Sequence, residues 1–342
     1  MNKLKIINLA LILFLSGICF TISAAQNTLV PINEYSEASE YILLNQYRAA
    51  ADVFDKFIQQ NPHEPAGPLL KAAALHYRSI DYDDTSFDEE YKGLLDTAEK
   101  LARMKIRADN NDLWARYFYY SARSLKAAWA VTNGKFISGI AQGKSGARGM
   151  SRILQDDDEF YDAYLMTGSY RFWKSIATVS VHWLPFFGDN CEEGIAEVET
   201  AITHGKLNGP LTNTVLLEML IVYDLDKAII LGEEMLRQYP SCRLFAWQLG
   251  EAYKRAGRFD NAVRVLTDIA GSFSNDSVDD GSGPLRCWWK LAVLCKSLGK
   301  KEQCRYYCEK IAKIGKNKSV YNRQRRRIEG AREMLEELKH DS

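Results

Sequence analysis

The sequence predicts an all-α superhelix of stacked helical hairpins, about seven pairs followed by a C-terminal capping helix. Two observations carry this prediction. A pattern of about 34 residues occurs over 243–276 and again over 285–318. No run alternates apolar and polar residues for long enough to indicate a half-buried strand. Because one hairpin cannot bury its apolar face alone, neighbouring hairpins bury it jointly and the chain grows as a superhelix.

The pattern places small or apolar residues at the same positions of each copy. Counted from Arg243 and from Leu285, these are positions 7, 8, 11, 15, 20 and 24. The residues are Leu249, Gly250, Tyr253, Gly257, Ala262 and Leu266 in the first copy, and Leu291, Ala292, Cys295, Gly299, Cys304 and Cys308 in the second. Small residues at positions 8 and 20 allow the two helices to approach closely. The spacing is that of a tetratricopeptide repeat (TPR), and the chain resembles the TPR superfamily.

Two further units follow the same spacing less strictly, over 31–64 and 209–242. Their matching residues are Ala38, Tyr41, Ala50 and Phe54 in the first and Ala228 in the second. The middle, 65–205, keeps helical periodicity in divergent pairs, and its Asp81-to-Glu89 stretch predicts an acidic loop between two helices. Residues 320–339 predict the capping helix. We therefore expect one TPR-like solenoid over 26–342.

The first 25 residues predict an export signal. Lys3 and Lys5 precede an apolar stretch, 6–20, and the small residues Ser23-Ala24-Ala25 follow. The apolar stretch is shorter than the roughly 20 residues that a membrane-spanning helix needs. We expect cleavage and export, most simply to a bacterial periplasm, with no membrane span afterwards. An uncleaved N-terminal anchor is the alternative.

The charge balance gives no reason to expect nucleic acid as a partner. The chain has 44 Lys+Arg and 44 Asp+Glu, and removal of the signal leaves two fewer lysines. Four arginines within 323–327 are a local exception, but three glutamates within 333–337 follow them. A solvated helix of mixed charge explains this segment. A docking patch for an acidic surface is the alternative.

Cysteine usage leaves two alternatives open. Beyond the signal the chain has Cys191, Cys242, Cys287, Cys295, Cys304 and Cys308. Three of them fall on core positions of the second repeat, where cysteine acts as a small buried hydrophobe. Export also permits a disulfide, and Cys295 and Cys304 lie almost equally far from the turn at Gly299. No nearby histidine and no CxxC spacing support a metal site.

The block from Tyr161 to Ala270 resembles a group of uncharacterised exported bacterial TPR proteins. The resemblance rests on Asp162-Ala163-Tyr164, on the linker Leu184-Pro185-Phe186-Phe187-Gly188-Asp189 and on His204-Gly205, and it covers roughly a third of the chain. It implies the TPR fold and export, and it implies no catalytic residue. No histidine pair or calcium-loop spacing indicates other chemistry, so we expect no catalytic residues and no cofactor. Gly139, Gly143, Gly146 and Gly149 predict a helix face for close packing.

The TPR resemblance implies that positions 2, 5, 9 and 12 of each first helix face a concave groove. In the two regular repeats these are Leu244, Trp247, Glu251 and Lys254, then Arg286, Trp289, Val293 and Lys296. Large aromatic side chains beside cations suit a bound peptide. We predict a non-enzymatic interaction scaffold of the cell envelope. Its groove would bind a peptide segment or partner protein through Trp247, Glu251, Lys254, Arg286, Trp289 and Lys296.

The alternative function is a carrier of a small molecule or lipid. Aromatic residues crowd the middle of the chain, 114–187: Trp114, Tyr117, Phe118, Tyr119, Tyr120, Tyr164, Tyr170, Phe172, Trp173, Trp183, Phe186 and Phe187. Adjacent aromatics on a helix point in different directions, so some must leave the core-facing stripe. A thick core and a groove for an apolar ligand both explain this composition.

Overall fold

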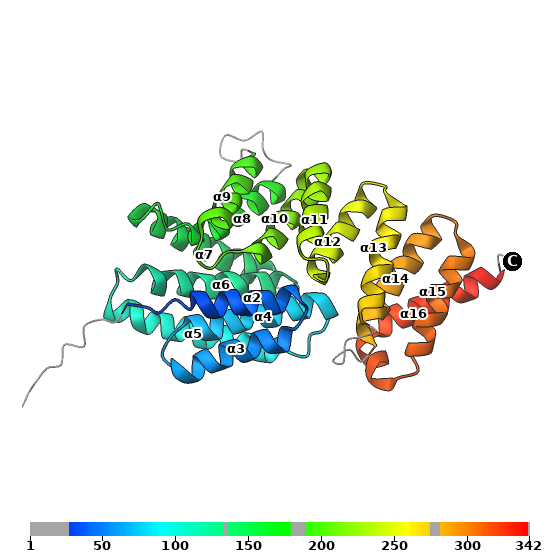
Figure 1. Cartoon of the computed structure of the whole chain (residues 1–342), viewed down its shortest axis with the longest axis horizontal. Coiled ribbons are helices and arrows are strands. Elements are labelled where there is room, and N and C mark those ends of the chain that lie inside the picture. Colours follow the sequence, from blue (N-terminus) through cyan, green and yellow to red (C-terminus); the bar gives the residue numbers. More distant parts are fainter. Residues whose placement is uncertain (1–26, 133, 135, 179–188, 274–280, 341–342) are drawn as a thin grey trace, which may run out of the picture.

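The computed structural model describes residues 27–132, 134, 136–178, 189–273 and 281–340, and in these residues it is helical without strands (Figure 1). The helices are α2 (Ile32–Leu43), α3 (Tyr47–Gln60), α4 (Ala66–Tyr82), α5 (Asp88–Ala108), α6 (Leu113–Thr132), α7 (Phe136–Asp156), α8 (Asp162–Ala177), α9 (Cys191–His204), the 3-10 helix η2 (Pro210–Thr212), α10 (Asn213–Tyr223), α11 (Leu225–Gln238), α12 (Arg243–Arg255), α13 (Phe259–Ser272), α14 (Ser282–Ser297), α15 (Lys301–Ile314) and α16 (Lys318–His340). They pair in chain order into seven hairpins, α2–α3 to α14–α15, and α16 packs on the last pair. The predicted all-α superhelix is confirmed.

Three hairpins turn in the same way at position 15 of the repeat. Asn45, Gly257 and Gly299 have φ of 61°, 72° and 69°, the left-handed region that glycine and asparagine tolerate best. In each turn this residue donates its N–H to the carbonyl three residues earlier, as Gly257 does to Lys254 at 3.2 Å. The next N–H reaches five residues back, as from Arg258 to Tyr253 at 2.9 Å. These bonds satisfy the last carbonyls of the first helix.

Small residues bring the middle helices together. A Cβ added to Gly149 on α7 would lie 2.2 Å from the ring of Tyr120 on α6, so only glycine fits there. On α8, a Cβ at Gly168 would lie 2.6 Å from the carbonyl oxygen of Gly194 on α9. The small-residue face predicted on α7 is confirmed at Gly149, and at Gly146 beside Ser124.

The chain turns back on itself, so hairpins far apart in sequence share a core. One buried apolar cluster runs from Ala38 on α2 through Leu217 on α10 to Leu294 on α14. Helix α4 contacts α12 and α14, and Figure 1 shows the end of α4 reaching the C-terminal repeats. Among the described residues, no helix combines the length and the apolar character needed to cross a membrane. The predicted signal, 1–25, lies outside the described residues.

Candidate functional site

A fully buried carboxylate marks the contact between α4 and the C-terminal repeats. Asp81, near the end of α4, is 0% exposed. Its oxygens accept hydrogen bonds from Nε of Arg243 at 2.7 Å, from Nε1 of Trp247 at 2.9 Å and from the hydroxyl of Tyr47 at 3.1 Å. Arg243 also donates to the hydroxyl of Tyr82 at 3.2 Å. We call these five residues the Asp81 cluster. A charge can be buried at this depth only when it is paired and hydrogen-bonded in this way.

Arg243 supplies the matching charge of the cluster. Its guanidinium carbon lies 4.1 Å from the ring centroid of Phe273 and 5.3 Å from that of Tyr82, which are cation–π distances. Burial acts to lower the pKa of Arg243, but the charge and hydrogen bond of Asp81, together with Tyr47 and Tyr82, outweigh it, so the pKa lies above its ordinary value. The guanidinium therefore stays charged although it is buried. The prediction of an acidic loop beginning at Asp81 is corrected here, since Asp81 lies inside α4.

Arg286 closes the end of α4 from the other side. Its Nη1 donates to the carbonyl of Ile80 and, at 3.4 Å, to that of Asp81. The last carbonyls of a helix lack intrahelical partners and form the negative end of its dipole, so a cation there is favourable. The same guanidinium lies 4.2 Å from the ring centroid of Trp247, and burial lowers the pKa of Arg286. Arg286 thus contacts α4 and the Asp81 cluster together.

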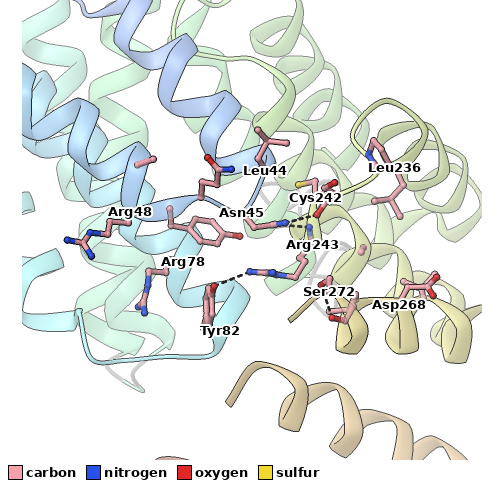
Figure 2. Close-up of a pocket in the computed structure, with 18 of the residues that line it drawn as sticks. Leu44, Asn45, Arg48, Arg78, Tyr82, Leu236, Cys242, Arg243, Asp268 and Ser272 are labelled. Atoms are coloured by element: carbon pink, nitrogen blue, oxygen red, sulfur yellow. Dashed lines mark hydrogen bonds between the residues drawn. The ribbon is translucent and has the colours of Figure 1, made fainter. Parts of the chain in front are cut away.

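Asn45 ties the first hairpin to the start of α12. Its Nδ2 donates to the carbonyl of Ser241 at 2.6 Å, and its Oδ1 accepts from the backbone N–H of Arg243 at 3.0 Å (Figure 2). The first N–H groups of a helix have no intrahelical partner, so Asn45 caps α12 from a distant segment. The glycines at this position of the other two turns have no side chain that could do so. Asparagine in a position that usually holds glycine was the one sequence signal for this contact.

Trp247 and Arg286 do not line an open groove, which corrects the prediction from the repeat positions. Trp247 is only 6% exposed, and α4 and Arg286 cover its ring. The prediction treated each repeat as contacting only its neighbours. In the structure α4 contacts α12, although the two helices are more than a hundred residues apart in the sequence. A pattern that describes only neighbouring repeats cannot predict such a contact.

The other four predicted groove residues lie on the first helices of the two C-terminal repeats, α12 and α14. Trp289 is half-buried against α16, where a Cβ on Gly330 would lie 2.6 Å from its ring. Glu251 pairs with Lys254 at 2.8 Å, and the exposed Lys296 pairs with Glu337 of α16. Burial acts to raise the pKa of Glu251, but hydrogen bonding to Lys254 and other nearby cations lower it overall. The structure therefore brings Glu251 and Lys254 together, while α16 engages Trp289 and Lys296.

A cavity of about 900 Å³ opens beside the Asp81 cluster (Figure 2). We call it the junction cleft, because the α2–α3 hairpin and the end of α4 form one side, and α11, α12 and α13 form the other. Arg48 and Arg78 lie on the first side, and Leu236 and Asp268 lie on the second, with Arg243 between them (Figure 2). The cleft thus offers apolar surface and charges of both signs above a hydrogen-bonded floor.

The two arginines of the first wall differ in their freedom. Arg78 pairs with Asp84 at 2.8 Å, and its guanidinium lies 4.2 Å from the ring centroid of Phe87, so it is held in place. Arg48 is exposed and has no ion pair within the described part of the chain. Cys242 also lines the cleft, and burial raises its pKa to about 11. Its thiol is therefore protonated at neutral pH and is a poor nucleophile.

The aromatic residues of α6 fill a core. Trp114 and Phe160 have ring centroids 4.6 Å apart, Trp114 and Tyr117 are 5.4 Å apart, and Phe118 is fully buried. Helix α6 and Phe160, which precedes α8, therefore use these rings for packing, and none of them lines the junction cleft. Three further residues of the aromatic middle lie outside the described residues: Trp183, Phe186 and Phe187.

All six described cysteines are free and buried. Cys295 and Cys304, the predicted candidates for a disulfide, carry separate thiols in this structure, and the Sγ of Cys295 lies 3.6 Å from Oε1 of Gln303. Burial raises the pKa of Cys308 to about 12. Within the described ranges no group of histidine, cysteine or acidic side chains could hold a metal ion.

Comparison with known proteins finds similarity in structure only. No protein-family model matches the sequence, and no curated protein matches it. A TPR protein from Thermus thermophilus is 14% identical with a TM-score of 0.40, covering 64% of this chain and 97% of that one. The C-terminal part of a TPR repeat-containing protein from Cytophaga hutchinsonii is 15% identical with a TM-score of 0.39, covering 84% and 98%. A tetratricopeptide repeat protein from Parabacteroides merdae is 10% identical with a TM-score of 0.37, covering 90% and 99%. We assign the fold of stacked helical hairpins from the helices of this chain and their pairing, and not from these comparisons.

Proposed function

We propose that this protein is a non-enzymatic interaction scaffold of the cell envelope that binds a polypeptide segment of a partner in the junction cleft. The observation that carries this proposal is the cleft itself, a cavity of about 900 Å³ between segments that lie far apart in the sequence. Its size falls within the range of ligand sites, roughly 300–1,000 Å³. The cleft replaces the concave groove of the regular repeats as the place where a partner binds.

The cleft suits a short segment with an apolar side chain and an acidic group. Leu44, 54% exposed at the α2–α3 turn, and Leu236 on α11 provide apolar contact on opposite sides. Arg48 provides a cation for a partner carboxylate, and Asp268 across the cleft sets the orientation of the segment by charge. The Asp81 cluster and Asn45 fix the floor, so little ordering of the protein opposes binding.

Site-specific photo-crosslinking tests where the partner binds. A photoreactive amino acid replaces Leu44 at the cleft, and in a matched variant it replaces Ile230, which is 66% exposed on α11 and does not line the cleft. After irradiation in cells we expect a discrete crosslinked partner at position 44 and none of the same mass at 230. Equal crosslinking at both positions, or at neither, would overturn the proposed site.

A charge reversal tests the role of Arg48. We expect Arg48→Glu to weaken recovery of the crosslinked partner about tenfold, since an attraction becomes a repulsion. Lys56→Glu is the matched control, because Lys56 is also exposed on α3 and lies outside the cleft. If both variants reduce recovery equally, overall charge and not the cleft recognises the partner.

Export is tested on the protein as it accumulates in cells. Mass spectrometry of the N-terminal peptide from an envelope fraction should show a chain that begins at Gln26. Retention of Met1 in the membrane fraction would indicate the uncleaved anchor. Recovery of the full chain in the cytosol would overturn the proposed location.

A further inference from the structure

A second charged surface lies on the last two helices, α15 and α16. Between Lys310 and Ile328 the chain has eight basic residues and no acidic one, although the whole chain has no net formal charge. They are Lys310, Lys313, Lys316, Lys318, Arg323, Arg325, Arg326 and Arg327. Such a local excess of one sign creates a potential that attracts the opposite charge.

The fold gathers part of this charge around aromatic rings. Tyr306, Lys310 and Lys313 are spaced by four and three residues, so they lie along one face of α15. The Nζ of Lys310 lies 4.6 Å from the ring centroid of Tyr306 and 5.1 Å from that of Trp288 on α14. These contacts hold the Lys310 ammonium over aromatic surface while leaving its charge available.

A cavity of about 470 Å³ lies beside Trp288 and Lys310, and we call this cavity the basic pocket. Trp288 and Ile314 give it apolar walls, Lys310 and Lys313 give it a cationic side, and Asn317 lies where α16 begins. The positive end of the α16 dipole adds to the charge of the lysines. The pocket can therefore take one apolar side chain with carboxylates close to it.

The surrounding cations differ in whether the protein already neutralises them. Arg325 pairs with Glu329 at 2.8 Å, and Arg327 pairs with Asp83. Lys313, Lys316 and Lys318 are exposed, and within the described ranges none of them has an ion pair. These three lysines therefore remain available to an anionic partner, whereas Arg325 and Arg327 are already paired.

We infer that the basic pocket binds an acidic polypeptide segment, with one apolar side chain against Trp288 and carboxylates on Lys310 and Lys313. A flat anionic membrane explains the recessed pocket less well, because a bilayer would contact protruding groups and leave the cavity unfilled. This site is separate from the junction cleft and does not depend on the function proposed for it.

Fluorescence anisotropy with the full-length protein tests this inference. The probe is a labelled synthetic peptide with one phenylalanine flanked by glutamates, and the reference probe has glutamine in place of each glutamate. We expect the acidic probe to bind at least about tenfold more tightly, and its advantage to shrink as salt rises. Equal affinity for the two probes would overturn the inference.

Charge reversal locates the binding. The double variant Lys310→Glu with Lys313→Glu should weaken binding of the acidic probe by about tenfold or more. The matched control, Lys100→Glu with Lys144→Glu, makes the same change in net charge at exposed lysines on α5 and α7. Circular dichroism verifies that both variants fold. Equal loss in the control would show unspecific attraction and overturn the site.

Two further measurements complete the test. The first asks whether the pocket binds an apolar side chain, and the second asks whether the surface binds a peptide or a membrane. Replacing the phenylalanine of the probe by glycine should weaken binding if the pocket takes a side chain, and an unchanged affinity would contradict this. Co-sedimentation with vesicles of equal phosphatidylglycerol and phosphatidylcholine should be weak. Strong sedimentation that the Lys310/Lys313 variant abolishes, without binding of the acidic peptide, would assign the surface to anionic lipid and overturn the inference.

Discussion

The two regular repeats, 243–276 and 285–318, have the same pattern but meet different parts of the chain. Trp247 and Trp289 occupy the same position in each. Trp247 donates a hydrogen bond to Asp81 of α4 and lies beneath Arg286, whereas Trp289 packs over Gly330 of α16. The repeat determines where each tryptophan points. The segment that covers each tryptophan is determined by the tertiary fold, which places α4 at Trp247 and α16 at Trp289.

This difference separates two kinds of contact. At Trp289 the covering helix follows the repeat directly, as expected for a capping helix on a solenoid. At Trp247 the cover comes from α4 and includes a buried ion pair, Asp81 with Arg243. Such a pair needs several donors in fixed positions, so it favours one arrangement of the two segments. The contact between α4 and the C-terminal repeats therefore adds a specific buried ion pair to a shared apolar core, while the contact with the capping helix is mainly apolar.

The largest expected effect comes from breaking the buried ion pair. Asp81→Ala leaves the guanidinium of Arg243 buried without its carboxylate, and we expect the free energy of unfolding to fall by about 3–5 kcal/mol. Urea denaturation followed by circular dichroism measures this loss. The control is Asp83→Asn, which removes the charge that pairs with Arg327 at the surface, keeps a residue that tolerates the left-handed backbone there and should cost no more than about 1 kcal/mol.

A double variant sharpens the same comparison. If the cost of Asp81→Ala comes from the unpaired charge, then adding Arg243→Leu should recover a large part of it. A double variant as unstable as the sum of the single variants would show that the two residues act separately.

A smaller effect distinguishes the two tryptophans. Phenylalanine keeps most of the ring but has no indole N–H. Trp247→Phe leaves an acceptor of the buried Asp81 without its donor, so it should destabilise by about 1–3 kcal/mol more than Trp289→Phe does. Thermal and chemical unfolding of the two variants measure the difference. Equal losses would mean that only ring volume counts at both positions.

The sequence predicted the features that depend on neighbouring residues. It missed the contact between α4 and the C-terminal repeats, which lie far apart in the chain. The 34-residue spacing predicted the hairpins α12–α13 and α14–α15, their turns at Gly257 and Gly299, and the burial of core position 24, where Cys308 lies. Asp81 looked like the first residue of an acidic loop, because its buried partner Arg243 lies 162 residues away and no local pattern links them. The junction cleft was missed for the same reason.

A more modest effect is expected at the turn that joins the first hairpin to α12. Asn45→Gly keeps the left-handed backbone but removes the hydrogen bonds to Ser241 and Arg243, so we expect a loss of about 1 kcal/mol. Hydrogen exchange at the N-terminus of α12 should quicken in this variant. Gly257→Asn is the control, since it builds the same turn residue where no such bonds exist; protection at α12 that changes equally in both would argue against the cap.

The smallest effect tests the cysteines on the core positions of the second repeat. Cys304 occupies the position that Ala262 fills in the first repeat, and both are fully buried. Cys304→Ala should therefore lower the free energy of unfolding by less than about 1 kcal/mol, because alanine fills the same position in the first repeat and only one sulfur is lost. A disulfide between Cys295 and Cys304 predicts otherwise, since removing one typically costs about 2–5 kcal/mol. Labelling with a thiol reagent followed by intact-mass measurement distinguishes free thiols from a disulfide independently. The native protein should react slowly, because burial protects these thiols. The unfolded protein should take up one label for every cysteine, because none is oxidised.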